Sequence, residues 1–154
     1  MRLQAQHQAE YERGSERLLE AVTKACAAQP DFAAKVRSAL EGGLTLLSTE
    51  PALVRLLSIR SDPQDQALAQ LQVFWRERYA DLLRRAARFS SEASTHPIFV
   101  EPILMGGIRW QIAAWVTAGR TAQLPELAPA LTRYVLCYYL PPQLASSVAV
   151  ADDA

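Results

Sequence analysis

The amino-acid sequence predicts a single all-α domain, and three observations lead to that prediction. The chain has 154 residues, which is the length of about one domain. Half of its residues are hydrophobic and 21% are charged, a balance typical of globular proteins rather than of disordered chains. Apolar residues recur at helical spacing almost everywhere, and no stretch alternates convincingly as a strand does. We therefore expect a six-helix bundle, closed by two long helices.

The first helix is expected over residues 6–28, with residues 1–10 assigned as a short polar extension ahead of the domain. Its inward stripe would consist of Tyr11, Ser15, Leu18, Leu19, Val22, Ala25 and Cys26. Gly14 lies inside this helix and weakens its first turns by about 1 kcal/mol relative to alanine. Pro30 ends the helix, because proline disfavours helical geometry in the residue before it.

Asp31 is a good N-cap for a second helix. Gly42 and Gly43 leave a notch on that helix, which indicates close packing against another helix or, less simply, room for a ligand. Thr49 is then expected to cap a short third helix that has Pro51 in its first turn.

A long fourth helix is predicted over residues 63–89, with Asp62 as its N-cap and Pro63 at its first position. Its apolar stripe includes Trp75 and Tyr79. The opposite face carries the basic residues Arg76, Arg84, Arg85 and Arg88. Because cations near a helix C-terminus are stabilised by the helix dipole, we favour that interpretation over a phosphate or DNA site.

The fifth helix is expected over residues 97–118, with Gly119 as its C-terminal cap. It is apolar on more than one side, so it must be covered nearly all round, and a second subunit would supply that cover.

The sixth helix is expected to start near Pro125 or Pro129 and to end before Pro141. Pro129 would either kink it or mark its true start. Residues 146–154 show no pattern and are expected to form a disordered tail.

Composition and charge exclude several classes of function. Sixteen Lys and Arg residues balance sixteen Asp and Glu residues, so the chain has no net positive charge that would attract nucleic acid or an anionic membrane. No apolar run is long enough to span a bilayer, and the polar N-terminus does not resemble a signal peptide. Cys26 and Cys137 both lie in apolar stripes, so we expect buried thiols in a reducing cytoplasm.

The sequence offers no catalytic constellation, so we expect no enzyme, no cofactor and no metal. His7 and His96 have no evident nucleophile beside them and are interpreted as surface residues. The spacings typical of zinc and di-iron sites are absent. Gly106 and Gly107 are a pair inside a helix and not a phosphate-binding loop.

Aromatic side chains at helical spacing usually belong to a core, but pockets between helices use the same residues with a few polar groups added. The candidate ligand-binding residues are Trp75, Tyr79 and Trp110, with Arg76, Arg109 and Gln111 as possible polar partners.

Two runs in the second half carry a family resemblance. One extends from Val100 to Arg120, contains the double glycine and ends in Ala-Gly-Arg; the other extends from Leu124 to Leu140 and begins Leu-Pro-Glu-Leu. Together they resemble the C-terminal pair of helices in the TetR-like transcriptional repressors. With the segments 17–32 and 44–57 included, the similarity covers nearly the whole chain. It consists of a pattern of helices and of the residues that begin and end them.

The resemblance implies a homodimer that senses a small apolar or aromatic effector. Its pocket would lie among the first, second, fourth and fifth helices, and its last two helices would pair with those of a second subunit. The dimer-interface residues expected on this basis are Ile108, Ile112, Trp115, Leu131, Val135 and Tyr138.

The family's helix-turn-helix head should precede the first helix, where this sequence has only about ten residues. We therefore expect residues 11–145 to form the regulatory domain, with no direct DNA binding by this chain alone. A fragment, a misplaced start and a natural head-less form all fit.

Three hypotheses follow, in order of preference. An effector-sensing domain predicts an apolar cavity in each subunit. A head-less dimerisation module, which modulates a full-length regulator, predicts a filled core. A helical-bundle enzyme predicts a polar group with a perturbed pKa deep in a cleft.

Overall fold

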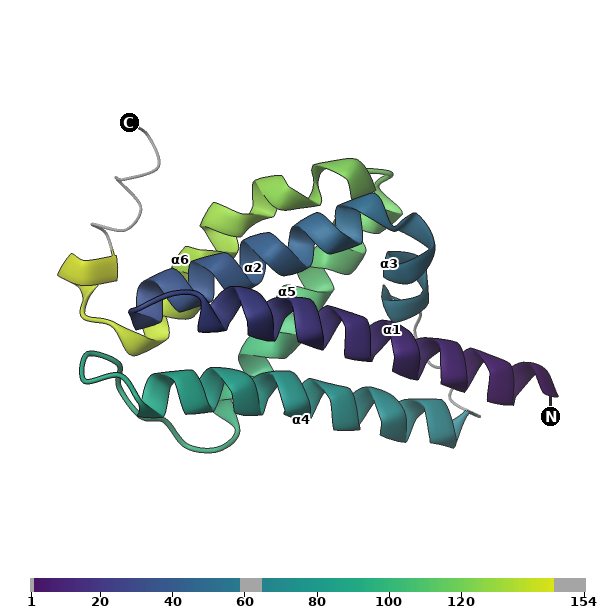
Figure 1. The fold of residues 1–154 in the computed structure, drawn as a ribbon, viewed down its shortest axis with the longest axis horizontal. Helices are drawn as coiled ribbons and strands as arrows, with labels where there is room; N and C mark the ends of the chain where they lie inside the picture. The colour runs from purple at the N-terminus through teal and green to yellow at the C-terminus, as the bar shows by residue number, and fades with distance from the viewer. Residues whose placement is uncertain (1, 59–64, 146–154) are drawn as a thin grey trace.

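The computed structural model describes residues 2–58 and 65–145. These residues form six α-helices and one 3-10 helix and contain no strand, which confirms the all-α prediction (Figure 1). The elements are α1 (Arg2–Ala27), α2 (Phe32–Thr49), α3 (Pro51–Ser58), α4 (Gln66–Arg88), α5 (Val100–Thr117), η1 (Thr121–Leu127) and α6 (Ala128–Tyr139). A further helical turn covers residues 142–145.

Helix α1 begins at Arg2, several residues before the expected start, so the segment assigned as an extension is helical from residue 2 onwards. Gly14 does not interrupt it. A Cβ atom added there would lie 2.5 Å from Leu53 Cδ1, so the missing side chain lets α3 pack closely against α1.

The expected start of α2 is confirmed, but that of α3 is not. Asp31 Oδ1 accepts a hydrogen bond of 2.8 Å from the backbone N–H of Ala34, as an N-cap does. Thr49 is the last residue of α2, and its hydroxyl donates to the carbonyl of Leu46 instead of capping α3. The carbonyl of Glu50 accepts the first helical hydrogen bond of α3, from Val54.

Helix α4 begins at Gln66, and Asp65 caps it by accepting a hydrogen bond of 2.9 Å from the backbone N–H of Leu68. This start is later than the predicted one, whose residues Asp62 and Pro63 lie outside the described part of the chain. Aspartate is a favoured N-cap at either position, so the sequence alone does not distinguish Asp62 from Asp65.

Helix α5 begins at Val100, three residues later than expected, and ends as predicted. Gly119 has a φ of 74°, its N–H donates to the carbonyl of Val116, and Arg120 N–H donates to that of Trp115. This pair of hydrogen bonds is the Schellman arrangement, which requires a left-handed residue that glycine provides without strain.

The two prolines near the sixth helix have separate roles. Pro125 lies within η1, whereas Pro129 lies in the first turn of α6, where a missing N–H costs nothing. Pro129 therefore marks the start of α6 and does not kink it. Residues 146–154, expected to form a disordered tail, lie outside the described residues.

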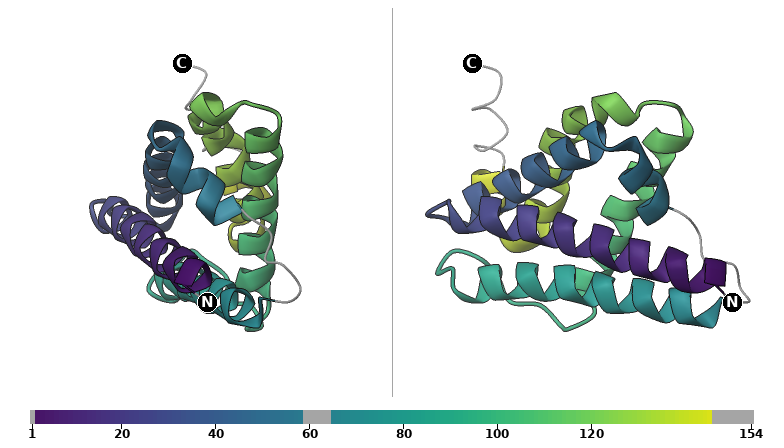
Figure 2. Two further views of the ribbon diagram at one scale, coloured as in Figure 1. Left: turned by 90° about the vertical axis from the view of Figure 1, so that its right-hand side faces the viewer. Right: turned by 45° about the vertical axis from the view of Figure 1, so that its right-hand side comes forward.

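Helix α2 lies at the centre of the molecule and contacts α1, α3, α4, α6 and η1. Helices α1 and α4 run alongside each other, and α5 crosses from the end of α4 towards η1 (Figures 1 and 2). One core cluster, which includes Phe32, Leu136 and Tyr139, joins α2 to α6, and a second, which includes Leu44 and Leu124, joins α2 to η1.

Candidate functional site

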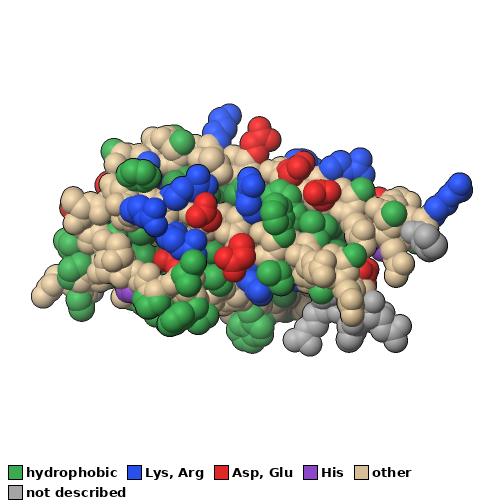
Figure 3. Space-filling model, turned by 90° about the horizontal axis from the view of Figure 1, so that it is seen from below, with side chains coloured by type: hydrophobic (Ala, Val, Ile, Leu, Met, Phe, Trp, Pro, Cys, Tyr) green, Lys and Arg blue, Asp and Glu red, His purple; other side chains and the backbone are tan. Residues whose placement is uncertain are grey.

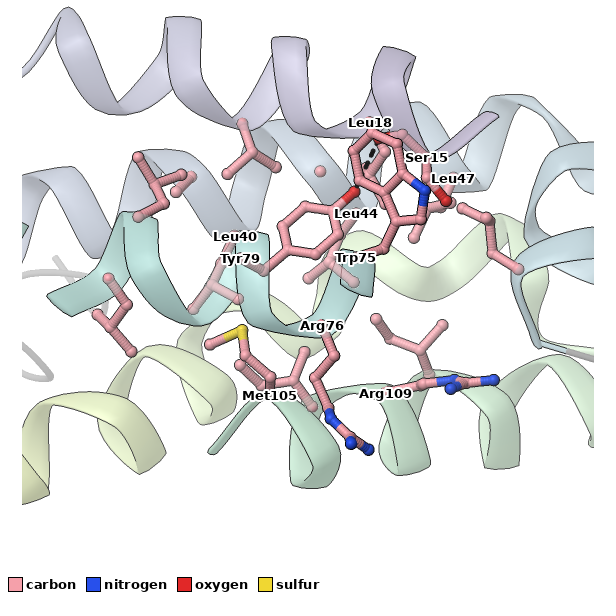
Figure 4. A pocket seen from close by; sticks show the side chains of 18 of the residues that line it. Ser15, Leu18, Leu40, Leu44, Leu47, Trp75, Arg76, Tyr79, Met105 and Arg109 are labelled. Carbon is pink, nitrogen blue, oxygen red and sulfur yellow. Dashed lines mark hydrogen bonds between the residues drawn. The ribbon is translucent and has the colours of Figure 1, made fainter. Parts of the chain in front are cut away.

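An apolar cavity of about 220 Å³ lies mainly among α1, α2, α4 and α5 and is partly open to solvent (Figure 4). Val54 and Leu57 of α3 and Val135 of α6 also contribute to its lining. Aliphatic side chains from three of these helices form most of its wall: Leu18, Val22, Leu40, Leu44, Met105 and Ile112. The stripe predicted for α1 faces this space rather than a filled core, which explains why Leu18 and Val22 stay partly exposed.

The glycine notch of α2 serves close packing and also borders the cavity. A Cβ added to Gly42 would lie 3.2 Å from Ala25 Cβ, and one added to Gly43 would lie 3.1 Å from Val22 Cγ2. These short distances explain how α1 and α2 approach each other. Gly43 also lines the cavity, so the two interpretations of the notch do not exclude each other.

The aromatic wall of the cavity comes from α4. Tyr79 extends towards α1, where its hydroxyl donates a hydrogen bond of 3.0 Å to the carbonyl of Ser15. Burial raises the pKa of the Tyr79 phenol, and the neighbouring Tyr11 raises it further. The phenol therefore stays neutral, and its proton is directed at the backbone of α1.

Two buried N–H donors at the cavity lack a partner. The side chain of Trp75 is only 5% exposed, and its Nε1 has no hydrogen-bond partner among the described residues. The buried Nε of Arg76 likewise has no hydrogen-bond partner among the described residues. A buried donor left unpaired costs about 1–3 kcal/mol, so both atoms would gain from an acceptor inside the cavity.

The charged residues at the cavity are all cations. Lys35, Arg76 and Arg109 contribute to its lining, and no Asp or Glu does so among the residues that the structure describes. Lys35 is already engaged, because its Nζ donates to the carbonyls of Cys26 and Gln29 at the end of α1. Arg76 on α4 and Arg109 on α5 are the other two cations of the lining.

Four of the six candidate ligand-binding residues line the cavity, namely Trp75, Arg76, Tyr79 and Arg109. Trp110 does not: it is 67% exposed on the outer side of α5, and Gln111 is also absent from the lining. Of the three neighbours 109–111 on α5, only Arg109 belongs to the lining. Neighbouring residues on a helix differ by about 100° in direction, so a helix that is apolar all round does not show which of them points inward.

The expected dimer-interface residues are divided between core and surface. Leu131 is 6% exposed and Val135 only 2%, so both are buried in the subunit's own core, where α6 packs on α2. This burial leaves them little surface for a partner, so they do not support the expected interface. Tyr138 is exposed.

Ile108, Ile112 and Trp115 are partly buried and pack against the subunit's own core clusters. The opposite side of α5 is the exposed one. It carries Phe99, Ile103 and Trp110, which are 60%, 63% and 67% exposed, together with Gly106. These four residues, called here the outer stripe of α5, form an apolar surface that the expected set missed.

The two cysteines differ in environment. Cys26 is buried at the cavity wall, and burial raises the pKa of its thiol, an effect that Lys35 only partly offsets. A thiol in that state is a poor nucleophile. Cys137 is exposed, contrary to expectation, because it lies on the side of α6 that faces away from α2.

Histidines and acidic residues gather no metal site in the described segments. His7 is exposed, as expected of a surface residue. His96 is half-buried instead: its ring packs edge-on against Tyr139 and its Nε2 contacts the carbonyl of Tyr138. This histidine therefore fastens the loop before α5 to the end of α6.

The basic face predicted for α4 is interspersed with carboxylates. Asp81 pairs with Arg84 at 3.5 Å and with Arg85 at 3.1 Å, and Arg84 also faces Glu101. Figure 3 shows positive and negative side chains next to each other on this side of the molecule.

In the described part of the chain, no helix is long and apolar enough to cross a membrane.

Sequence and structure comparisons add no relative to this picture. No protein-family model, no curated protein and no solved structure matches the chain. The cavity and the outer stripe of α5 are the features of the described chain that bear on its function.

Proposed function

We propose that this chain is the effector-sensing and dimerising domain of a transcriptional regulator of the TetR-like type. The cavity among α1, α2, α4 and α5 carries the proposal, because the family resemblance places an effector pocket among these same helices. The predicted aromatic residues Trp75 and Tyr79 form part of its wall.

The size and the lining of the cavity support a ligand. Protein interiors are close-packed, and a sealed, empty cavity of 220 Å³ would cost about 5 kcal/mol. Solvent can enter this one, but apolar walls give water few hydrogen-bond partners. An apolar molecule would fill the space at a lower free energy than water does.

The two alternatives receive less support. A pure dimerisation module needs no cavity and predicts a filled core. An enzyme needs an activated group, whereas burial raises the pKa of both Tyr79 and Cys26 and keeps them protonated. Neither is suited to act as a base or a nucleophile near neutral pH.

Helix α5 connects the two halves of the proposed function. Its inner side supplies Met105, Arg109 and Ile112 to the cavity. Its outer stripe is the surface that a second copy of the chain would cover. A ligand that binds more tightly when α5 is in one orientation than in another would favour that orientation. It would therefore change the geometry of the dimer and of any attached DNA-binding heads.

A combined measurement of melting temperature and mass in solution tests the proposal. We expect a dimer whose melting temperature rises with some members of a panel of apolar and aromatic compounds, because a ligand of the folded state stabilises it by mass action. The Ala39→Leu variant partly fills the cavity and should lose this response. The exposed Ala130→Leu variant should keep it.

A dimer that responds to no compound would contradict effector sensing and favour the dimerisation module. A monomer at all concentrations would contradict the dimeric part of the proposal.

A further inference from the structure

One fully buried hydrogen-bond donor in the cavity wall lacks an acceptor. Trp75 is 5% exposed, and its Nε1 has no hydrogen-bond partner among the described residues. Figure 4 shows this nitrogen on the side of Ser15 and Leu47, which line the same cavity. An indole N–H donates and does not accept, so only an acceptor atom satisfies it. Because a buried tryptophan usually finds such an acceptor, Trp75 points to one that a ligand brings.

The polar side chains beside Trp75 are engaged with one another. The hydroxyl of Tyr79 donates to the carbonyl of Ser15, and the hydroxyl of Ser15 is hydrogen-bonded to the phenol of Tyr11. Water is a poor substitute for a ligand here, because a buried water needs about two to four polar partners. The cavity wall is mostly aliphatic and offers few of them.

The surroundings of Trp75 favour an acceptor without charge. Figure 4 shows Arg76 and Arg109 away from the rings of Trp75 and Tyr79, so an anion bound at the arginines would leave the indole N–H unpaired. A carboxylate placed at Trp75 instead would exchange its hydration for one neutral donor. Burying a charge in that way costs far more than burying a carbonyl group that is hydrogen-bonded.

Neither arginine requires an anionic ligand. Burial raises the pKa of Tyr11, and the nearby Arg109 partly offsets that rise, so Arg109 already interacts with a group of this chain. Arg76 is half-buried and keeps part of its contact with solvent. The acceptor that Trp75 lacks therefore sets the polar requirement of the ligand.

A carbonyl oxygen meets this requirement with the fewest further demands. It accepts a hydrogen bond and brings no donor, whereas a hydroxyl group adds a proton that needs an acceptor of its own. A dry cavity of about 150 Å³ holds benzene, so by proportion the 220 Å³ cavity suits a molecule of roughly nine non-hydrogen atoms. Small ketones and esters have this size and an apolar body.

We infer that the cavity binds an uncharged, largely apolar carbonyl compound, such as a ketone or an ester, whose oxygen accepts the hydrogen bond of Trp75 Nε1. This inference deepens the proposed function and rests on it, since it names the chemical class of the effector. Trp75 is then a specificity-determining residue, because it distinguishes a ligand with an acceptor from a hydrocarbon of the same shape.

Nitrogen–proton correlation spectra of the isotope-labelled whole chain test this hydrogen bond directly. The chain has three tryptophans and so three indole N–H signals. Loss of one signal in Trp75→Phe assigns Trp75, and elimination with Trp110→Phe and Trp115→Phe assigns it independently. The probes are acetophenone, isopropylbenzene and benzoate, which share a phenyl ring and have equal numbers of non-hydrogen atoms. We expect acetophenone to move the Trp75 signal downfield, as an acceptor does, and isopropylbenzene to move it much less.

Calorimetric titration measures what the hydrogen bond contributes to affinity. Trp75→Phe should weaken acetophenone binding about tenfold and change isopropylbenzene binding by less than about twofold, because only the ketone loses a hydrogen bond. Comparing two ligands in two proteins cancels the effect of the smaller ring on packing. Trp110→Phe is the matched control at a 67% exposed position outside the lining, and it should change neither affinity. Benzoate should bind most weakly of the three, and melting curves verify that each variant folds.

The inference is overturned if acetophenone binds without moving the Trp75 signal, if isopropylbenzene moves it as far, or if Trp75→Phe weakens both ligands equally. It is also overturned if acetophenone does not bind while benzoate, isopropylbenzene or another compound of the wider panel does. Each of these results would leave the proposed sensor intact with an effector of another class. If no compound binds at all, the proposed function fails as well.

Discussion

At the scale of single residues, Glu101 near the start of α5 is a charged group buried inside the subunit. It is 2% exposed, and its Oε1 accepts a hydrogen bond of 2.9 Å from the hydroxyl of Tyr139. Arg84 faces its other oxygen at 3.5 Å. Burial and the carboxylate of Glu101 raise the pKa of Tyr139, while Arg84 opposes them, so the phenol remains a donor. The contact joins α4, α5 and α6 at one point.

Removing the Tyr139 hydroxyl should therefore be costly. We expect Tyr139→Phe to lower the free energy of unfolding by about 1–3 kcal/mol, because it leaves a buried carboxylate oxygen without its donor. Denaturant unfolding measures the change. Tyr138→Phe is the control at an exposed position, where the effect should stay within about 0.5 kcal/mol. Equal losses in both variants would contradict a special role for the buried contact.

At the scale of secondary-structure elements, α5 shows how one helix serves two surfaces. Ile108 and Ile112 face the subunit, while Ile103 and Trp110 lie roughly opposite, at about 100° per residue. Its end at the Gly119 cap was predictable because local chemistry determines it. Its orientation was not, because apolar residues occur all round the helix and tertiary packing alone selects the inner side.

The double glycine of α5 gives a matched pair of variants. A Cβ added to Gly106 meets nothing within 4 Å, whereas one added to Gly107 would lie 2.5 Å from Tyr134 Oη. We expect Gly106→Ala to raise the free energy of unfolding by up to about 1 kcal/mol, through helix propensity. Gly107→Ala should gain less or lose stability, because Tyr134 must move.

Thermal and denaturant unfolding of the two variants measure this difference in stability. If Gly107→Ala stabilised the protein as much as Gly106→Ala, the close approach of α5 and α6 at Tyr134 would be contradicted. Gly106 also belongs to the outer stripe, so both variants are best compared at one protein concentration.

At the scale of the whole molecule, the cavity and the outer stripe of α5 lie on opposite sides of the same helix. Exposed Phe99, Ile103 and Trp110 leave apolar area in contact with water, which burial in a dimer would remove at about 25 cal/mol per Å². The open space over Gly106 would let a partner helix approach closely. These observations favour the outer stripe over the interface residues expected from the sequence.

Charge placed on this stripe should dissociate the proposed dimer. We expect Trp110→Glu and Ile103→Glu to give monomers at concentrations where the unmodified chain is dimeric, because two carboxylates would face each other across the two-fold axis. Sedimentation or light scattering measures the mass. Phe89→Glu is the control, since Phe89 is 86% exposed but lies after α4, away from α5. A dimer that survives both stripe variants would refute this interface.

The sequence by itself determined the features that depend on neighbouring residues. Helical periodicity predicted the all-α fold, Asp31 and Gly119 marked two helix ends, and Trp75 and Tyr79 fell on one apolar stripe that lines the cavity. Each of these follows from local hydrogen bonding or from one clear apolar stripe.

Only the tertiary structure decided the features that depend on which surfaces meet. It placed Arg109 inward and Trp110 outward, buried Leu131 and Val135 in the subunit core, and left a cavity where a filled core was equally compatible with the pattern. Helical patterning shows that one face of a helix is apolar, but it does not show what covers that face. Packing against α2, lining a cavity and packing against a second subunit all remove apolar area from water. All three therefore require the same kind of apolar residue at the same helical spacing.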